Sequence, residues 1–414
     1  MGARRQHHSD WSGQALLHAV DYVRSANSFR ARNSSDMRIV TMLDNLIGPE
    51  RPLSWVLQFW PVLVFSFISA LVATSLCKSI ALKLGIVDKP DNLVKTHKGT
   101  VAYLGGVGIL AGLTVGVLTG IYCIGDQEHF RLPLTWLVAV LAGGAIACLI
   151  GLVDDIFDIK PRHKILGQII AAVVLVLVGI RPALYYSLAG ARIPENIEVI
   201  LGIPIVIIFV LGASNSLNLL DGLDGLCAGV TVIITAACLL LAIHLGTWGF
   251  SEVGGDAVRV IICLGLLGAV CGFLPFNHHP AKIFMGDAGS MLLGFVVAAL
   301  MILFAERIPR WWMASVVVFG LPILDTAVAL VRRFVNKRPL FVSDRGHIYD
   351  QMIDRGIPLK RTVAICYGLA AMYALIGLAM SQIRTRYALI VYIVVFVASG
   401  VVVWKKGYLK MGNW

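Results

Sequence analysis

Runs of about 20 apolar residues recur along this chain and constrain its fold more than any other feature. Each run is long enough to cross the roughly 30 Å hydrocarbon core of a bilayer as a helix. Of the 414 residues, 58% are hydrophobic and only 14% are charged, against about 25% charged in soluble domains. We therefore predict an all-α, polytopic transmembrane helical bundle. Its expected spans number about eleven and lie near residues 60–84, 101–123, 134–153, 165–180, 199–213, 227–246, 259–275, 290–305, 311–331, 362–381 and 387–404.

The lysines and arginines are concentrated in alternate loops. The loops near 89–98, 160–164, 282, 332–361 and 405–410 hold most of them, whereas the opposite loops have fewer and include several glutamates. Loops rich in Lys and Arg stay on the cytoplasmic side. We therefore predict a multi-pass membrane protein with these basic loops in the cytoplasm. Orientation and anionic ligands account for the net charge of +11, and nucleic-acid binding is not expected.

Residues 1–50 differ from the rest of the chain because they are polar and of mixed charge. No apolar run follows the early arginines closely enough to form a cleavable signal peptide. We treat this segment as an N-terminal tail that is either flexible or upstream of a true start at Met37, and assign it no function. Residues 51–414 form the predicted integral membrane domain.

The sequence SNSLNLLDGLDG at 214–225 lies between two apolar runs. Its polar residues Asn215, Asn218, Asp221 and Asp224 recur at every third position, a spacing that places helical neighbours side by side. Carboxylates near a bilayer lose hydration at a large cost unless they are compensated. We interpret the segment as a helix end that presents two amides and two carboxylates to one cavity; a helix cap followed by a turn is the alternative.

A second acidic group, with the sequence DDIFD at 154–158, ends the third expected span. Asp154 and Asp158 share a helical face, and a basic stretch that includes Lys164 follows at once. Carboxylates at a helix C-terminus oppose the helix dipole, so an ordinary helix end explains them poorly. A divalent cation or a basic clamp on the substrate explains their placement better.

The segment 275–290 joins the seventh and eighth expected spans, and Asp287 lies in it between two glycines at the start of a helix. The carboxylate is either a helix cap or a metal ligand, and the glycines would admit a phosphate beside the helix N-terminus. His278 and His279 could also bind a metal. Oxygen donors dominate these motifs, however, so Mg²⁺ is favoured over zinc.

Two further cytoplasmic loops supply cations. The loop at 95–106 carries Lys98, and the longest loop carries Arg345 and His347, whose side chains can bind an anion. Ordinary charged loops are the alternative. Taken together, acids interleaved with bases fit Mg²⁺-dependent chemistry on a diphosphate, where the metal bridges phosphate oxygens and cations stabilise the developing charge.

At these motifs the chain resembles the polyprenyl-phosphate N-acetylhexosamine-1-phosphate transferases, over roughly residues 60–360. The resemblance rests on NxxNxxDGxDGL at 215–226 and on the pairing of DDxxD at 154–158 with PAxxFMGDxGS at 280–290. It is greatest to the bacterial enzymes that use undecaprenyl phosphate and GlcNAc-1-phosphate. It implies transfer of a sugar-1-phosphate from a UDP-N-acetylhexosamine to polyprenyl phosphate with release of UMP, as the first membrane step of cell-envelope polysaccharide synthesis.

The resemblance also implies roles for individual residues. Mg²⁺, with Mn²⁺ as an alternative, would be held by Asn218 and Asp287. Asp154 and Asp155 would act on the lipid phosphate or as a base, and Lys164 would contact phosphate. We place Asp221 and Asp224 in the same catalytic group. The residues expected to bind substrate are Lys98, Asp158, Asn215, Arg345 and His347.

One departure from the family pattern concerns the later histidine motif, which is usually HIHH or a triple histidine. Here residues 347–350 read HIYD, so only His347 carries over and Asp350 reverses the expected charge. The identity of the transferred sugar is therefore open: GlcNAc is favoured, and phospho-N-acetylmuramoyl-pentapeptide transfer is the alternative. An ion-coupled transporter is the alternative from another class, although its acids would lie near the bilayer midplane. Assembly into a homodimer is left open.

Overall fold

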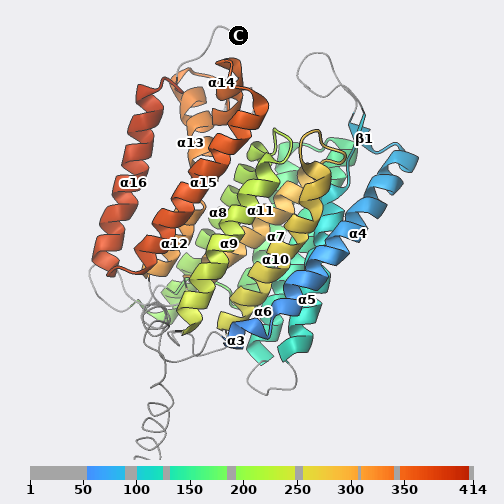
Figure 1. Cartoon of the computed structure of the whole chain (residues 1–414). Helices are drawn as coiled ribbons and strands as arrows, with labels where there is room; N and C mark the ends of the chain where they lie inside the picture. The colour runs from blue at the N-terminus through green and yellow to red at the C-terminus, as the bar shows by residue number, and fades with distance from the viewer. Residues whose placement is uncertain are drawn as a thin grey trace, which may run out of the picture. The chain divides into compact units, whose positions relative to one another are not determined.

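The computed structural model describes residues 54–88, 100–124, 131–183, 193–247, 255–305, 309–339 and 346–409. The prediction for residues 1–50 lies outside this part of the chain. Figure 1 shows a bundle of long helices with one short pair of strands. The elements in chain order are α3 (Ser54–Leu57), α4 (Trp60–Leu84), β1 (Val87–Asp88), β2 (Val101–Ala102), α5 (Gly105–Ile124), α6 (Arg131–Phe157), α7 (Pro161–Leu177), α8 (Glu195–Leu220), α9 (Leu226–Thr247), α10 (Gly255–Asn277), α11 (Gly286–Leu303), α12 (Pro309–Val318), α13 (Gly320–Val335), α14 (Ile348–Asp354), α15 (Leu359–Ser381) and α16 (Thr385–Lys405).

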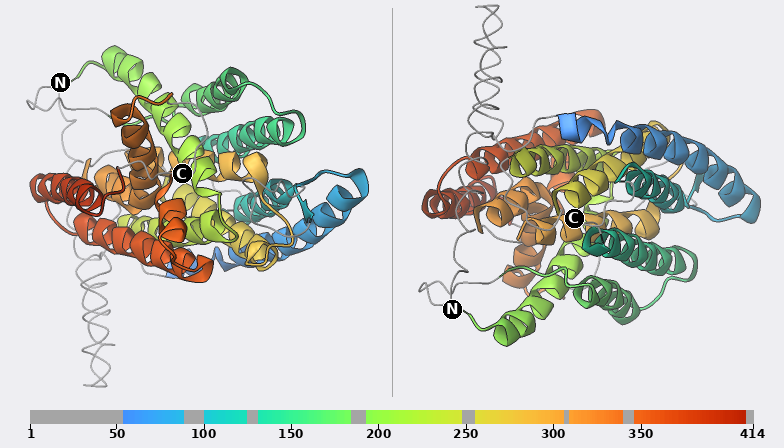
Figure 2. Two further views of the ribbon diagram at one scale, coloured as in Figure 1. Left: turned by 90° about the horizontal axis from the view of Figure 1, so that it is seen from above. Right: turned by 90° about the horizontal axis from the view of Figure 1, so that it is seen from below.

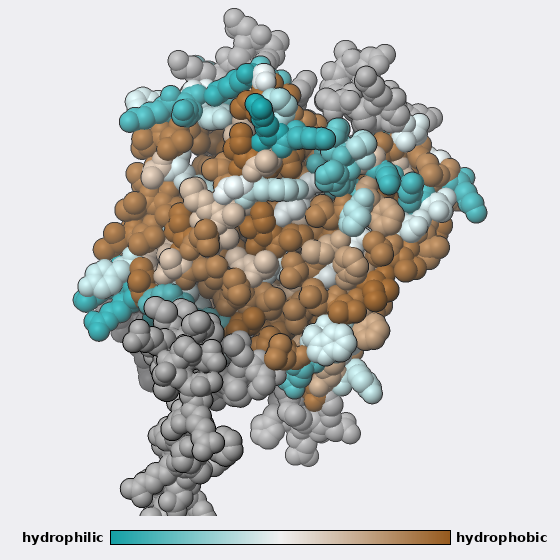
Figure 3. Space-filling view, in the orientation of Figure 1, coloured by the Kyte–Doolittle hydropathy of each residue, from teal (hydrophilic) through white to brown (hydrophobic). Residues whose placement is uncertain are grey.

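The prediction of a polytopic helical bundle is confirmed. Among the described residues, nine helices are long and apolar enough to cross a membrane, and α12 with α13 makes a tenth if the bent pair is one span. The remaining expected span, near 165–180, corresponds to α7, which has 17 residues. Figure 3 shows the matching surface, an apolar belt with polar residues gathered towards its two ends.

The expected span at 311–331 is not one straight helix. It is divided into α12 and α13, which meet at an angle of 67°. Pro322 lies in the first turn of α13. It has no N–H to donate to the carbonyl four residues earlier, and its ring would clash with that carbonyl in a continuous helix. The proline therefore explains why the helix breaks here.

Helix α11 lies at the centre of the bundle and is buried along almost its whole length. It packs against α5, α6 and α8. A Cβ at Gly151 of α6 would lie 2.3 Å from the Asp287 carbonyl oxygen, and one at Gly294 would lie 2.3 Å from the Ser214 Cα on α8. Membrane helices associate closely where such small residues meet. The N-terminus of α11 is thereby brought against the ends of α6 and α8.

The outer helices complete the bundle. Seen along the helix axes, α4 and α16 lie at opposite edges (Figure 2). Both expose many large apolar side chains, including Phe65 and Leu76 on α4 and Ile393 and Val397 on α16. Exposed apolar surface of this extent is expected where a helix contacts lipid.

A small antiparallel hairpin, which the all-α prediction did not include, precedes α5. Val87 pairs with Ala102 and Asp88 with Val101. The second strand also contacts the segment before α11, because the Phe284 N–H donates to the Ala102 carbonyl oxygen at 2.9 Å. The hairpin therefore ties the entrance of α5 to the entrance of α11. In the sequence, Lys98 falls between the two strands, and it is outside the described residues.

Candidate active site

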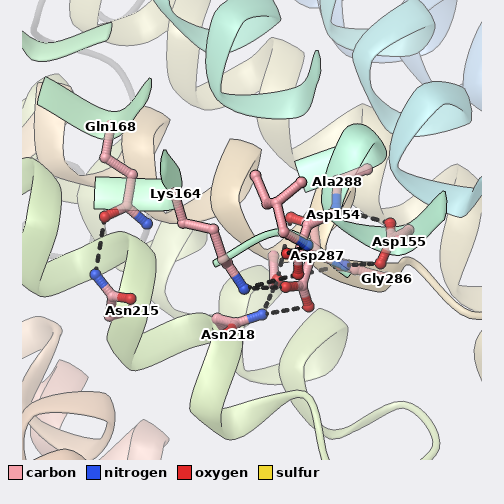
Figure 4. A network of polar contacts seen from close by, with 11 residues as sticks. Asp154, Asp155, Lys164, Gln168, Asn215, Asn218, Gly286, Asp287 and Ala288 are labelled. Atoms are coloured by element: carbon pink, nitrogen blue, oxygen red, sulfur yellow. Dashed lines mark hydrogen bonds and ion pairs between the residues drawn. The ribbon is translucent and has the colours of Figure 1, made fainter. Parts of the chain in front are cut away.

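Four helix ends meet at one end of the bundle and bring predicted site residues together (Figure 4). Asp154 lies in the last turn of α6, Lys164 in the first turn of α7, Asn218 in the last turn of α8 and Asp287 in the first turn of α11. These residues come from three motifs separated by up to 133 positions. We call this group the acid–lysine cluster.

The ammonium of Lys164 lies between two carboxylates in the acid–lysine cluster. Its Nζ is 3.0 Å from Asp154 Oδ2 and also forms an ion pair with Asp287 Oδ2. Asn218 Nδ2 donates to Asp287 Oδ1 at 2.7 Å and to Ser290 Oγ at 3.0 Å. The three charged side chains are only partly exposed, between 13% and 25%. In such surroundings charges interact more strongly than in water, so Lys164 stabilises both acids.

Asp155 faces the N-terminus of α11. Its Oδ1 accepts the Asp287 N–H at 2.8 Å and its Oδ2 accepts the Ala288 N–H at 3.1 Å. The first amides of a helix lack intrahelical partners and favour a negative charge. The helix N-terminus beside which sequence analysis expected a phosphate therefore has two of its amides bonded to this carboxylate. Asp287 is not a helix cap, since its side chain contacts Lys164 and Asn218 instead.

This arrangement makes Gly286 a sensitive position. Its φ is +67°, and an added Cβ would lie 2.4 Å from Asp155 Oδ2. Gly286→Ala should lower transferase activity about 100-fold, because both the backbone strain and the contact displace the carboxylate from the α11 amides. Gly212→Ala on α8 is the matched control, since a Cβ there meets nothing within 4 Å. Initial rates and melting temperatures of both variants would test this, and equal activity of the two would contradict it.

Asp221 and Asp224 lie in the turn between α8 and α9. Asp224 Oδ2 accepts the Ala281 N–H at 3.0 Å and lies 2.8 Å from His279 Nδ1, so it fixes the turn to the loop before α11. Burial raises the pKa of Asp221 well above its usual range, and the negative charges of Asp287, Asp155 and Asp224 raise it further. A cation brought near Asp221 would lower this pKa and favour the charged form.

Other predicted residues lie away from the acid–lysine cluster. Asn215 is one helical turn from Asn218, where its Nδ2 donates to Gln168 Oε1 at 2.9 Å and to the Leu211 carbonyl oxygen at 2.7 Å. Asp158 is exposed beyond the end of α6, with a φ of +48°. Lys98 and Arg345 are outside the described residues, so their predicted roles stay predictions.

His347 is buried and pairs with an acid that sequence analysis missed. Its Nδ1 lies 2.7 Å from Oδ2 of Asp325, which is on α13. Asp325 is the one charged residue in the run at 311–331. A lone acid inside an apolar span is by default a candidate functional residue, and this signal could have identified it. Gln168 and Ser290 had no comparable signal, because amides and hydroxyls occur throughout membrane helices.

The acid–lysine cluster contains oxygen atoms of the kind that bind Mg²⁺. Within the described residues, no group of three or more His, Cys, Asp or Glu side chains could hold a metal ion on its own. Mg²⁺ is commonly bound through one or two carboxylates, with waters and substrate phosphates completing the octahedron. Asp287 supplies a carboxylate, and Asn218 can present its oxygen because its amide can be flipped. The donor set thus fits Mg²⁺ bound together with a phosphate substrate.

Comparison with known proteins identifies the family. Residues 136–305, which include the acid–lysine cluster, match the model of glycosyl transferase family 4. A decaprenyl-phosphate N-acetylglucosaminephosphotransferase of Mycobacterium tuberculosis is 31% identical over 71% of this chain and 76% of its own length. The chain belongs to glycosyl transferase family 4. This family 4 transferase is therefore a phosphotransferase enzyme, as the motifs at 154–158, 215–226 and 280–290 indicated, and the transporter interpretation is wrong.

Two other relatives match this family 4 transferase over most of its length. A probable undecaprenyl-phosphate N-acetylglucosaminyl 1-phosphate transferase of Bacillus subtilis is 28% identical over 81% of the chain and 88% of its own length. An undecaprenyl-phosphate alpha-N-acetylglucosaminyl 1-phosphate transferase of Escherichia coli K12 is 28% identical over 72% of the chain and 78% of its own length. The similarity extends well beyond the region matched by the family model.

Proposed function

We propose that this enzyme transfers GlcNAc-1-phosphate from UDP-GlcNAc to a polyprenyl phosphate such as undecaprenyl phosphate, with Mg²⁺ as cofactor. The observation that carries the proposal is the acid–lysine cluster at the ends of four membrane helices, where a soluble nucleotide sugar and a membrane lipid can meet. The names of the relatives support GlcNAc as the sugar and a polyprenyl phosphate as the acceptor. The reaction would be the first membrane step of a cell-envelope polysaccharide.

The proposed reaction exchanges one phosphoanhydride bond for another. An oxygen of the lipid phosphate attacks the β-phosphorus of UDP-GlcNAc, and the bond from this phosphorus to the bridging oxygen breaks. UMP leaves with the bridging oxygen, and the product is a polyprenyl diphosphate that carries GlcNAc. The second pKa of a phosphoester is near 6, so much of the acceptor is dianionic at pH 7 and needs little help from a base.

The chain's residues serve mainly to position charge in this proposal. Asp287 and Asn218 would hold Mg²⁺, which neutralises the diphosphate oxygens when bound. Lys164 stabilises the acids beside it and can contact a phosphate oxygen. Asp155 fixes the N-terminus of α11, on which Asp287 lies. Such fixed electrostatic contacts are the main source of catalysis in phosphoryl transfer.

The cytoplasmic face of the inner membrane is the proposed location of the site. The loops that join helices at this end include exposed Lys160, Arg162, Lys282 and Lys337, as the positive-inside bias requires. Nucleotide sugars are soluble and would reach the cluster from this side. Arg345 and His347 are assigned to the donor, because a long cytoplasmic loop can contact a molecule that arrives from water.

Removal of the metal tests the proposal directly. Purified enzyme with radiolabelled UDP-GlcNAc and undecaprenyl phosphate should form a labelled lipid in Mg²⁺, and EDTA should lower the rate at least about 100-fold. Excess Mg²⁺ should restore it. The matched comparison uses UDP-N-acetylmuramoyl-pentapeptide, which should give little product. Equal rates in EDTA and Mg²⁺ would contradict the metal assignment. Preference for the pentapeptide donor would contradict the assignment of GlcNAc as the transferred sugar.

A further inference from the structure

Asp325 holds one segment of the chain with both of its carboxylate oxygens. Oδ2 lies 2.7 Å from His347 Nδ1, and Oδ1 accepts the Ile348 N–H at 2.6 Å. The acid is buried in the bundle with 1% exposure, and His347 has 5% exposure. A buried carboxylate is costly unless its oxygens accept hydrogen bonds. These two contacts provide that compensation, so the position of His347 depends on Asp325.

The pairing also determines which nitrogen of the imidazole can act. Oδ1 of Asp325 accepts the Ile348 N–H, and Oδ2 lies within hydrogen-bond distance of Nδ1. A carboxylate oxygen is an acceptor, so we assign the hydrogen of this contact to Nδ1 of His347. Nε2, on the other edge of the ring, makes no hydrogen bond to any described residue. It is therefore the nitrogen left to contact a substrate.

Tyr349 connects this histidine to the acid–lysine cluster. Its ring stacks on His347 with centroids 5.5 Å apart and planes at 9°. Its hydroxyl donates to the Leu219 carbonyl oxygen at 2.8 Å. Leu219 is the residue after Asn218 in the last turn of α8. The residue that departs from the usual histidine motif thus fixes the His347 ring beside the helix end that carries Asn218.

We propose that Asp325 is a positioning residue for transfer, and that it acts by orienting His347 so that Nε2 contacts the diphosphate of the nucleotide donor. This inference rests on the proposed function. Asp325→Asn keeps the shape of the side chain, but its amide nitrogen would donate to Nδ1 and shift the hydrogen to Nε2. Partners that orient metal-binding histidines typically contribute about 10- to 100-fold, and we expect an effect of the same order for a histidine that contacts a phosphate.

A double-mutant cycle tests the inference. Asp325→Asn should lower kcat/KM for UDP-GlcNAc about 10- to 100-fold and change the KM for undecaprenyl phosphate less than about twofold. In a His347→Gln background the same substitution should have almost no further effect, because the effects of substitutions at two residues that act as a unit do not add. Thr326→Val is the matched control. Thr326 bonds to Ser216 Oγ at 2.9 Å and not to His347, so its effect should be additive with His347→Gln.

Two further measurements keep the outcome decisive. If Asp325→Asn does not fold, Tyr349→Phe keeps the stacked ring and loses only the hydroxyl bond, and its smaller effect should also vanish with His347→Gln. In addition, the affinity of each variant of the cycle for UDP can be measured by calorimetry, which does not require turnover. A wild type that forms no lipid product would overturn the proposed function, and the cycle would then be judged by UDP affinity. Independent, additive effects of Asp325 and His347 would overturn the inference.

Discussion

Asp287→Asn should lower kcat about 1,000-fold while the protein stays folded. The substitution removes the carboxylate that pairs with Lys164 and Asn218, and it leaves a neutral amide where a hard cation needs an anionic oxygen. The Asp287 N–H that bonds to Asp155 belongs to the backbone and is retained. Local structure should therefore change little, and the loss of activity should result from the loss of the negative charge.

The residual activity of Asp287→Asn would show whether the missing charge serves the metal. Half-maximal activity should require more Mg²⁺ than in the wild type, because the variant lacks an anionic ligand. Asp354→Asn, the same chemical change at the end of α14, is the matched control and should keep near wild-type activity. Full activity of Asp287→Asn at the wild-type Mg²⁺ concentration would exclude Asp287 as a metal ligand.

Lys164→Met is expected to have the second largest effect, a loss of about 100- to 1,000-fold in kcat/KM. The methionine retains much of the side-chain volume but leaves Asp154 and Asp287 without the ammonium between them. Loss of one partner from a partly buried ion pair leaves the other charge uncompensated. Lys164→Arg keeps the charge with a different geometry and should lose only about tenfold.

The Mg²⁺ dependence separates the two variants. Loss of a cation does not weaken metal binding, so Lys164→Met should not raise the Mg²⁺ concentration needed for half-maximal activity, in contrast to Asp287→Asn. Rates measured across a Mg²⁺ titration, with melting temperatures as a check on folding, provide the comparison. If Lys164→Met and Lys164→Arg are equally active, the charge between the two acids is not used in the reaction.

Much of the fold could be predicted because hydrocarbon thickness determines the length of an apolar run. The break at Pro322 could also have been predicted from its chemistry, since a proline inside an expected span is a known cause of helix bending. The pairing of Val87 with Ala102 could not, because the two strands have only two residues each and carry no periodic signal.

The candidate site was predictable as a set of motifs but not as a set of contacts. Charge asymmetry predicts that Asp154, Asn218 and Asp287 lie on one side of the membrane. Their contacts with one another depend on the close packing of helices, such as that of Gly151 on α6 against Asp287 on α11. The bonds from Asp155 to the α11 amides are likewise tertiary contacts between distant segments. Such contacts leave no trace in residue spacing. They give Asp155 a structural contact that fixes the end of α11, and its predicted action on the lipid phosphate or as a base stays a prediction.

The fate of the β-phosphate tests the central claim most directly. Purified enzyme would be given undecaprenyl phosphate, Mg²⁺ and UDP-GlcNAc labelled with ³²P at the β-phosphorus, and the lipid and nucleotide products would be separated. Transfer of the sugar with its phosphate predicts that the label enters the lipid and that an equal amount of unlabelled UMP is released. Label recovered in free UDP would show transfer of the sugar alone and would contradict the proposed reaction.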